Sequence, residues 1–219
     1  MDTPDAELVD TPAGPARITW HRPEGRARCV LALGHGAGGG ITARDLAALA
    51  AALPEREVNV ALVEQPWRVA GKKIAPAPRT LDVGWTAVWP RLAAPGLPVV
   101  AGGRSAGARV ACRTAHPLGA AAVLALAYPL HPPGKPEKSR YEELAGAAAV
   151  LPLLGVQGGA DTFGRPEEFP ADRRPVEVPY GDHGFVVPKR APVTQEAALA
   201  LLTGTVAEWL TGLGFAAPA

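Results

Sequence analysis

The chain has 219 residues, of which 47% are hydrophobic and 20% charged, a balance typical of a globular protein with one α/β domain over residues 1–219. Its formal net charge of +1 argues against partners such as nucleic acids and anionic membranes. The acidic N-terminus shows no apolar signal segment, and the longest apolar run, 120–127, is too short to span a bilayer. We therefore expect a cytoplasmic protein, monomeric or homodimeric, that binds neither nucleic acid nor membrane.

Short apolar runs alternate with segments of helical periodicity. Most of the central runs are apolar at nearly every position, which is typical of parallel strands buried on both faces. The alternation predicts an α/β fold with a mostly parallel, doubly wound sheet of about seven to eight strands. The expected strands are Arg17–Trp20, Cys29–Leu33, Val58–Val63, Pro98–Gly102, Ala122–Leu126, Leu153–Gln157 and Val176–Val178.

Apolar stripes predict the helices between these strands. Thr42 or Asp45 is expected to cap the first helix. Because the segment 128–152 is short, it predicts only a minimal lid, with a short helix near Ser139–Ala147, over an open and shallow site. The stripes are Leu46, Leu49 and Leu53, then Leu81, Trp85, Val88 and Leu92, then a helix from Ala106 to about Ala115, and last Leu199, Leu202, Val206, Trp209 and Leu213 before Gly214.

In a sheet of this kind, ligands bind beyond the carboxyl ends of the strands. The first such end carries the glycine-rich loop Gly34–Gly40. Its main chain can approach a substrate closely, and we expect the backbone N–H of Ala37, or alternatively of Gly36, to face the reacting atom. A phosphate-binding loop is the weaker interpretation, since no G-x-x-x-x-G-K-[ST] occurs. His35 either reacts or braces the loop, and we favour the brace.

The next strand end carries Glu64 and Trp67, which either line the cleft or form an ordinary turn. After 122–126 comes a proline-rich loop with Tyr128 and His131. Each of these two side chains either touches the substrate or packs within the loop.

The pentapeptide Gly103-Arg104-Ser105-Ala106-Gly107 lies between an expected strand and an expected helix. This is the context of a G-x-S-x-G nucleophile elbow. The flanking glycines are needed because a Cβ there would strike a neighbouring strand or helix. The pattern predicts Ser105 as the nucleophile and the backbone N–H of Ala106 as an oxyanion donor.

An acid and a histidine follow the last two strands. Asp161 comes after 153–157, and His183 comes after 176–178. The order Ser105, Asp161, His183 is the chain order of a hydrolase triad on a doubly wound sheet. Asp182 and Asp172 are competing acids, but Asp182 adjoins the histidine and Asp172 does not directly follow a strand.

Arg104 and Arg109 flank the nucleophile. Arg104 either binds an acidic group of the substrate or forms a salt bridge beneath the site, to Glu64 or Asp45. We favour the salt bridge.

With these residues in hand, the chain resembles the KANL/Tex hydrolase-like family of α/β-hydrolases, which is related to the dienelactone hydrolases. The resemblance implies an α/β-hydrolase fold and the roles of Ser105, Asp161 and His183. The family usually has a larger residue at Ala106, so the acyl pocket is expected to be wider here. The similar segments are Leu33–Gly39, Ala101–Arg109, Tyr128–Lys135, Val156–Gly164 and Gly181–Phe185.

The sequence thus predicts a serine hydrolase that cleaves a carboxylic ester of a small, water-soluble acyl substrate, without a cofactor or metal. Two alternatives stay open: thioesterase or acyltransferase chemistry on the same triad, and a catalytically silent scaffold protein. Cys29 and Cys112 are expected to be buried, reduced thiols, and no cysteine–histidine cluster has zinc-site spacing.

Overall fold

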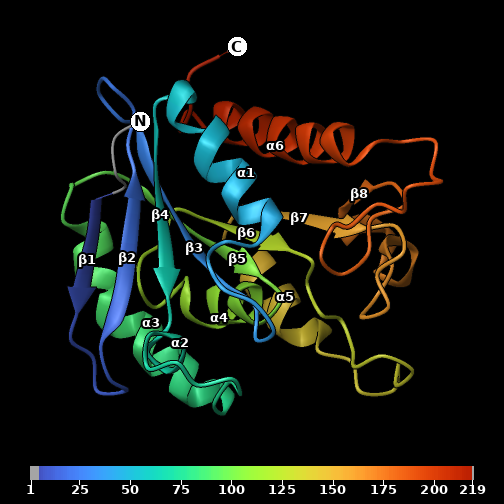
Figure 1. Cartoon of the computed structure of the whole chain (residues 1–219), viewed down its shortest axis with the longest axis horizontal. Helices are drawn as coiled ribbons and strands as arrows, with labels where there is room; N and C mark the ends of the chain where they lie inside the picture. The colour runs from blue at the N-terminus through green and yellow to red at the C-terminus, as the bar shows by residue number, and fades with distance from the viewer. Residues whose placement is uncertain (1–4, 219) are drawn as a thin grey trace.

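The computed structural model describes residues 5–218 and is built around one sheet (Figure 1). The strands are β1 (Asp5–Val9), β2 (Ala16–His21), β3 (Cys29–Gly34), β4 (Val58–Glu64), β5 (Val99–Arg104), β6 (Ala122–Leu126), β7 (Leu153–Gly158) and β8 (Val176–Val178). They lie in the order β1-β2-β4-β3-β5-β6-β7-β8. β2 is antiparallel to both β1 and β4, and all other neighbours are parallel. The predicted mostly parallel, doubly wound sheet is confirmed.

Helices cover both faces of the sheet (Figure 1). One face carries α1 (Arg44–Ala52) and α6 (Gln195–Gly212), and the other carries α3 (Pro78–Ala93), α4 (Ala106–Thr114) and α5 (Tyr141–Ala148). The short helix α2 (Pro66–Val69) directly follows β4. None of the helices within residues 5–218 combines the length and apolar content that a membrane crossing requires.

Strand β3 shows how the two helix layers share one sheet. Its side chains alternate between the faces. Val30 and Ala32 pack in the core beneath α3 and α4, whereas Leu31 and Leu33 pack in the core beneath α1 and α6. Every residue of β3 is buried, which explains its unbroken apolar run.

All seven predicted strands are present, and β1 is an additional one. β1 could not be predicted from an apolar run, because its five residues are exposed or half-buried and pair only with β2 at the edge of the sheet. Such an edge strand can be polar on both faces. Its Glu7 accepts a hydrogen bond from Trp20 Nε1 at 3.0 Å.

Two details of the predicted helices are wrong. The N-cap of α1 is Ala43, not Thr42 or Asp45, and no side chain caps it. Asp45 lies within the first turn, fully buried, where it faces an arginine instead. In α6, Leu202 and Val206 are buried and the partly buried Trp209 and Leu213 pack against the same core, as expected, but Leu199 is not part of that core and the buried face continues through Leu210.

The helix predicted near 139–147 is present as α5, and its Leu144 and Ala147 are buried in the core shared with α4. It therefore belongs to the helix layer. The buried, free thiols expected at Cys29 and Cys112 are also found, and burial raises the pKa of each to about 12.

Candidate active site

Ser105 lies in the turn that joins β5 to α4, and its backbone conformation is unusual. Its φ and ψ are 54° and −111°. Such a conformation costs a residue with a side chain about 1–3 kcal/mol, so the surrounding structure must enforce it. The N–H of Ser105 donates to the carbonyl oxygen of Leu126 at 2.9 Å, which ties the turn to β6.

Gly103 and Gly107 permit this turn because neither position has room for a side chain. A Cβ on Gly103 would lie 2.6 Å from the carbonyl oxygen of Gly34, and a Cβ on Gly107 would strike the same atom. The steric reason inferred from the G-x-S-x-G pattern is therefore confirmed. The elbow packs directly against the end of β3.

The structure brings Ser105, His183 and Asp161 together. His183 Nε2 lies 2.9 Å from Ser105 Oγ, and His183 Nδ1 lies 2.8 Å and 3.1 Å from the two carboxylate oxygens of Asp161. The three residues follow β5, β8 and β7, so parallel strands deliver them to one edge of the sheet. In this arrangement Nδ1–H donates to the carboxylate, which leaves Nε2 free to accept the hydroxyl proton.

Asp161 is fully buried, and two more donors hold its carboxylate. Gln157 Nε2 donates at 2.9 Å and the backbone N–H of Phe163 donates at 2.8 Å. The Gln157 amide also donates to the carbonyl oxygens of Tyr128 and Gly164. Sequence reasoning did not single out Gln157. A polar side chain at the end of an apolar strand was the signal that could have found it.

Phe163 is a second residue that sequence reasoning missed. Its ring stacks on the imidazole of His183, with centroids 4.1 Å apart and an interplanar angle of 27°. The ring therefore restricts the rotation of the imidazole. No sequence pattern distinguishes this phenylalanine from an ordinary loop residue.

The competing acids lie elsewhere. Asp182 Oδ1 accepts the backbone N–H groups of Gly184 and Val186, so this side chain shapes the loop that carries His183. Asp172 lies exposed in a 3-10 turn, Ala171–Arg173.

The residues of the two predicted oxyanion donors lie in the cleft that contains Ser105. Ala37 and Ala106 line the same cleft as Ser105. Ala106 is the first residue of α4, where a backbone N–H has no partner within the helix. Gly36 also lies close to the serine, since a Cβ there would be 3.4 Å from Ser105 Cβ. Within residues 5–218, no acceptor is found for the N–H of Ala37 or Ala106. Their role toward an oxyanion stays a prediction.

Arg104 connects several parts of the site. Its Nε lies 3.6 Å from Asp45 Oδ2, and its Nη2 donates to the carbonyl oxygen of His183 at 2.8 Å. The expected salt bridge of Arg104 is therefore formed with Asp45. Glu64, the other expected partner, pairs with Arg17 at 3.0 Å. Burial raises the pKa of the Asp45 carboxyl, and the nearby guanidinium opposes that rise.

His35 lies behind the glycine loop, outside the lining of the cleft. Its Nε2 accepts the backbone N–H of Gln65 at 3.1 Å, so Nδ1 carries the proton and donates to the carbonyl oxygen of Gly36 at 2.9 Å. The ring lies 5.6 Å from that of Trp67, and burial lowers the pKa of the imidazole. These contacts place His35 as the brace of the loop.

Tyr128 and His131 are also absent from the cleft lining. The Tyr128 hydroxyl donates to the carbonyl oxygen of Arg140 at 2.7 Å. His131 Nε2 lies 2.9 Å from Glu168 Oε2. Burial acts to lower the pKa of His131, but hydrogen bonds to Pro132 and Glu168 outweigh it and raise that pKa. Both residues hold the loop that follows β6.

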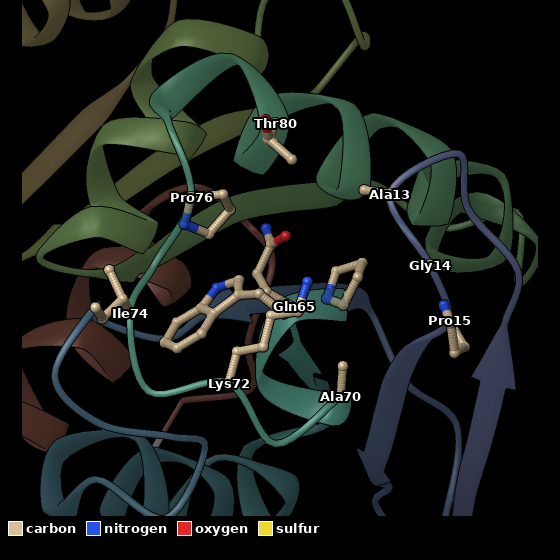
Figure 2. Close-up of a pocket in the computed structure, with 11 residues that line it drawn as sticks. Ala13, Gly14, Pro15, Gln65, Ala70, Lys72, Ile74, Pro76 and Thr80 are labelled. Atoms are coloured by element: carbon tan, nitrogen blue, oxygen red, sulfur yellow. The ribbon is translucent and has the colours of Figure 1, made fainter.

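The cleft around Ser105 has a volume of about 430 Å³. A separate pocket of about 120 Å³ lies around Trp67, between Ala13–Pro15 and the segment with Lys72, Ile74 and Pro76 (Figure 2). Trp67 is thus placed in the second pocket, and Ser105 is not among its lining residues. The Ser105 cleft is lined by Ala37, Gly38, Arg104, Ser105, Ala106, Arg109, Pro129, Arg140, Phe163 and His183.

A family model described as an alpha/beta hydrolase domain matches residues 26–211. The structure of an α/β serine hydrolase without a lid from Xanthomonas campestris is 20% identical to this chain. The alignment covers 100% of this chain and 97% of that protein, with a TM-score of 0.72. Dienelactone hydrolase from Anabaena variabilis is 19% identical over 96% of this chain and 97% of its own, with a TM-score of 0.69. Esterase 2 from Thermogutta terrifontis, phosphonylated by cyclosarin, is 18% identical over 100% of this chain and 98% of the esterase, with a TM-score of 0.67. These likenesses show a shared fold. No curated protein matches the chain.

Proposed function

The chain belongs to the alpha/beta hydrolase domain family, and from this premise we propose that it is a serine hydrolase that cleaves carboxylic esters of small, water-soluble substrates. One observation carries the proposal: His183 lies between Ser105 Oγ, at 2.9 Å, and the buried carboxylate of Asp161, at 2.8 Å. A nucleophile, a base and an orienting acid in this sequence of contacts form the arrangement that acyl transfer needs.

The first half of the reaction forms an acyl-enzyme. Ser105 Oγ attacks the ester carbonyl while His183 Nε2 takes its proton, and Asp161 stabilises the resulting imidazolium. The backbone N–H groups of Ala106 and Ala37 receive the oxyanion. Each such donor contributes about 10²–10³ in turnover in other enzymes. The tetrahedral intermediate then breaks its bond to the alkoxy oxygen, which leaves as the alcohol with the proton from His183.

In the second half, a water molecule gives a proton to His183 and attacks the acyl carbon. The ester bond to Ser105 breaks, the acid departs, and the serine hydroxyl regains its proton from His183.

The proposed preference for small substrates rests on the shape of the site. The cleft of about 430 Å³ is of a size that suits a drug-sized molecule, and α5, in the segment that follows β6, packs into the helix layer beside α4. A cleft of this size favours short acyl chains over long lipids. Ala106 leaves room beside the nucleophile for the acyl group.

Hydrolysis of 4-nitrophenyl acetate by the purified protein and by Ser105→Ala tests the proposal. We expect saturable hydrolysis by the wild type and only background release of 4-nitrophenol with the variant. Equal rates for the two proteins would contradict it and favour a scaffold role. A matched series of acyl thioesters and alcohol acceptors then separates ester hydrolysis from thioesterase and transfer activity on the same residues.

A further inference from the structure

The cleft beside Ser105 has a one-sided charge. Three arginines, Arg104, Arg109 and Arg140, are among its lining residues, and no aspartate or glutamate is. The other polar side chains that line the cleft are the imidazole of His183 and the hydroxyl of Ser105. A substrate in this cleft therefore meets cationic side chains and no opposing carboxylate.

Most of the arginines around and behind the cleft are already neutralised by carboxylates. The pairs of Arg109 and Arg113 also link α4 to α3 and α5. Arg104 pairs with Asp45, Arg109 pairs with Glu143 through two hydrogen bonds of 2.6 Å and 2.8 Å, and Arg113 pairs with both Asp82 and Glu143.

Arg140 is the exception. Among residues 5–218, no carboxylate lies within ion-pair distance of its guanidinium, because the oxygens of the nearby Glu143 are taken by Arg109 and Arg113. Its side chain makes one hydrogen bond, a long one of 3.3 Å from Nη1 to the carbonyl oxygen of Pro129. A guanidinium has five N–H donors, so most of those of Arg140 are unused.

The backbone of Arg140 is nevertheless held firmly. Its N–H donates to the carbonyl oxygen of Leu130 at 2.7 Å, and its own carbonyl accepts the hydroxyl of the buried Tyr128 at 2.7 Å. Burial and the neighbouring charge of Arg109 lower the pKa of Arg140, which is the sign of a cation without a sufficient counter-charge. The arrangement presents an unpaired cation, on an anchored stretch of backbone, at the wall of the cleft.

We propose that the cleft selects esters that carry a carboxylate, and that Arg140 binds this carboxylate while Ser105 attacks the ester carbonyl. The planar guanidinium matches the two oxygens of a carboxylate, which favours this anion over a neutral polar group. Arg109 lines the same cleft, but Glu143 already balances its charge, so the selectivity is assigned to Arg140. The inference rests on the proposed ester hydrolysis and names its substrate class.

Matched pairs of esters test this inference on the purified wild-type protein. The 4-nitrophenyl hemiesters of glutarate, adipate and suberate place a carboxylate on the acyl side, and each is compared with the neutral 4-nitrophenyl ester of the same acyl length. On the leaving-group side, 4-acetoxybenzoate is compared with its methyl ester. We expect one anionic member to exceed its neutral partner in kcat/KM by about tenfold to hundredfold, the effect of a hydrogen bond to a charged group.

Arg140→Gln is expected to remove this ratio, mainly through a higher KM for the anionic ester, and Arg140→Lys to restore part of it. Arg79→Gln removes the same charge from an exposed position at the start of α3 and is expected to keep the wild-type ratio. A ratio near one for every pair, or a ratio that survives Arg140→Gln, would overturn the inference alone. If no ester shows turnover that depends on Ser105, the proposed function fails and the inference fails with it.

Discussion

The guanidinium of Arg104 donates a hydrogen bond of 2.8 Å to the main-chain carbonyl oxygen of His183. Arg104 precedes Ser105 directly in the chain, so this contact joins the elbow to the loop that carries His183. The same guanidinium faces the buried Asp45 on α1 and lies against the glycine loop, where a Cβ on Gly36 would be 2.9 Å from Nη1. One side chain therefore fixes the relative positions of the candidate nucleophile, base and oxyanion loop.

Replacing Arg104 by lysine tests this positioning role. An ammonium group cannot reach Asp45 and the His183 carbonyl with separate planar donors as a guanidinium does. We expect kcat for 4-nitrophenyl acetate to fall about 10- to 100-fold, the range for misplacing a catalytic group by about 1 Å, with little change in KM. Circular dichroism checks that the fold is kept. A wild-type kcat in Arg104→Lys would show that the contact does not position His183.

Gln157 holds the carboxylate of Asp161 from inside β7. In Gln157→Leu, the carboxylate and the carbonyl oxygens of Tyr128 and Gly164 lose a buried donor. Each unsatisfied buried group costs about 1–3 kcal/mol, so we expect the free energy of unfolding to fall by roughly 2–4 kcal/mol and the activity to fall as well. Urea unfolding monitored by tryptophan fluorescence measures the first, and ester hydrolysis the second. An unchanged unfolding midpoint would contradict this account of Gln157.

Gly103→Ala is expected to prevent correct folding of the elbow, because the new methyl would lie 2.6 Å from the carbonyl oxygen of Gly34. Gly204→Ala on α6 is the matched control. A Cβ at position 204 meets nothing within 4 Å, and alanine in a helix is favoured over glycine by about 1 kcal/mol. Thermal unfolding of both variants should therefore show opposite shifts. A shift in the same direction for both would count against the steric account.

Glu143 makes stability depend on pH. Burial acts to raise its pKa, but hydrogen bonds and charges from Arg109 and Arg113 outweigh burial and lower that pKa below its ordinary value of 4.5. The stabilisation is therefore complete above about pH 4.5 and is lost as the pH falls through the lower folded-state pKa.

Glu143→Gln should therefore reduce the free energy of unfolding by about 1–2 kcal/mol at neutral pH, a range already lowered because the side chain is partly exposed. The difference should shrink in acid. Glu142→Gln, at the exposed neighbouring position, removes the same charge and should show no such pH dependence. A difference for Glu143→Gln that stays constant down to strongly acidic pH would contradict the assignment.

Much of the fold was predictable because short runs such as 29–33 and 122–126 are apolar at every position, which is typical of strands buried on both faces of a sheet. Ser105, Asp161 and His183 were predictable as neighbours for a related reason: each follows a parallel strand, and those ends meet at one edge. The polar edge strand β1 gave no such signal, since water and a single neighbouring strand satisfy it.

The contacts that support the site were not predictable from spacing. Gln157 within β7 reaches Asp161, and Phe163 in the following loop reaches His183, only because the folded chain turns that loop back beside the strand. Asp45 shows the same limit. Its position before an apolar stripe is typical of a helix cap, but its pairing with Arg104 depends on how α1 packs against the end of β5. His35, Tyr128 and His131 carry reactive side chains, yet tertiary contacts turn them toward the loops they brace.

The central claim is that Ser105 is a nucleophile activated by His183. A fluorophosphonate probe, followed by mass mapping of the modified peptide, tests it most directly, because the reaction requires an activated hydroxyl and no knowledge of the substrate. We predict one adduct, on Ser105, that is absent in Ser105→Ala and forms far more slowly in His183→Ala. An adduct on another residue, or labelling of Ser105 at the same rate without the imidazole, would contradict the claim.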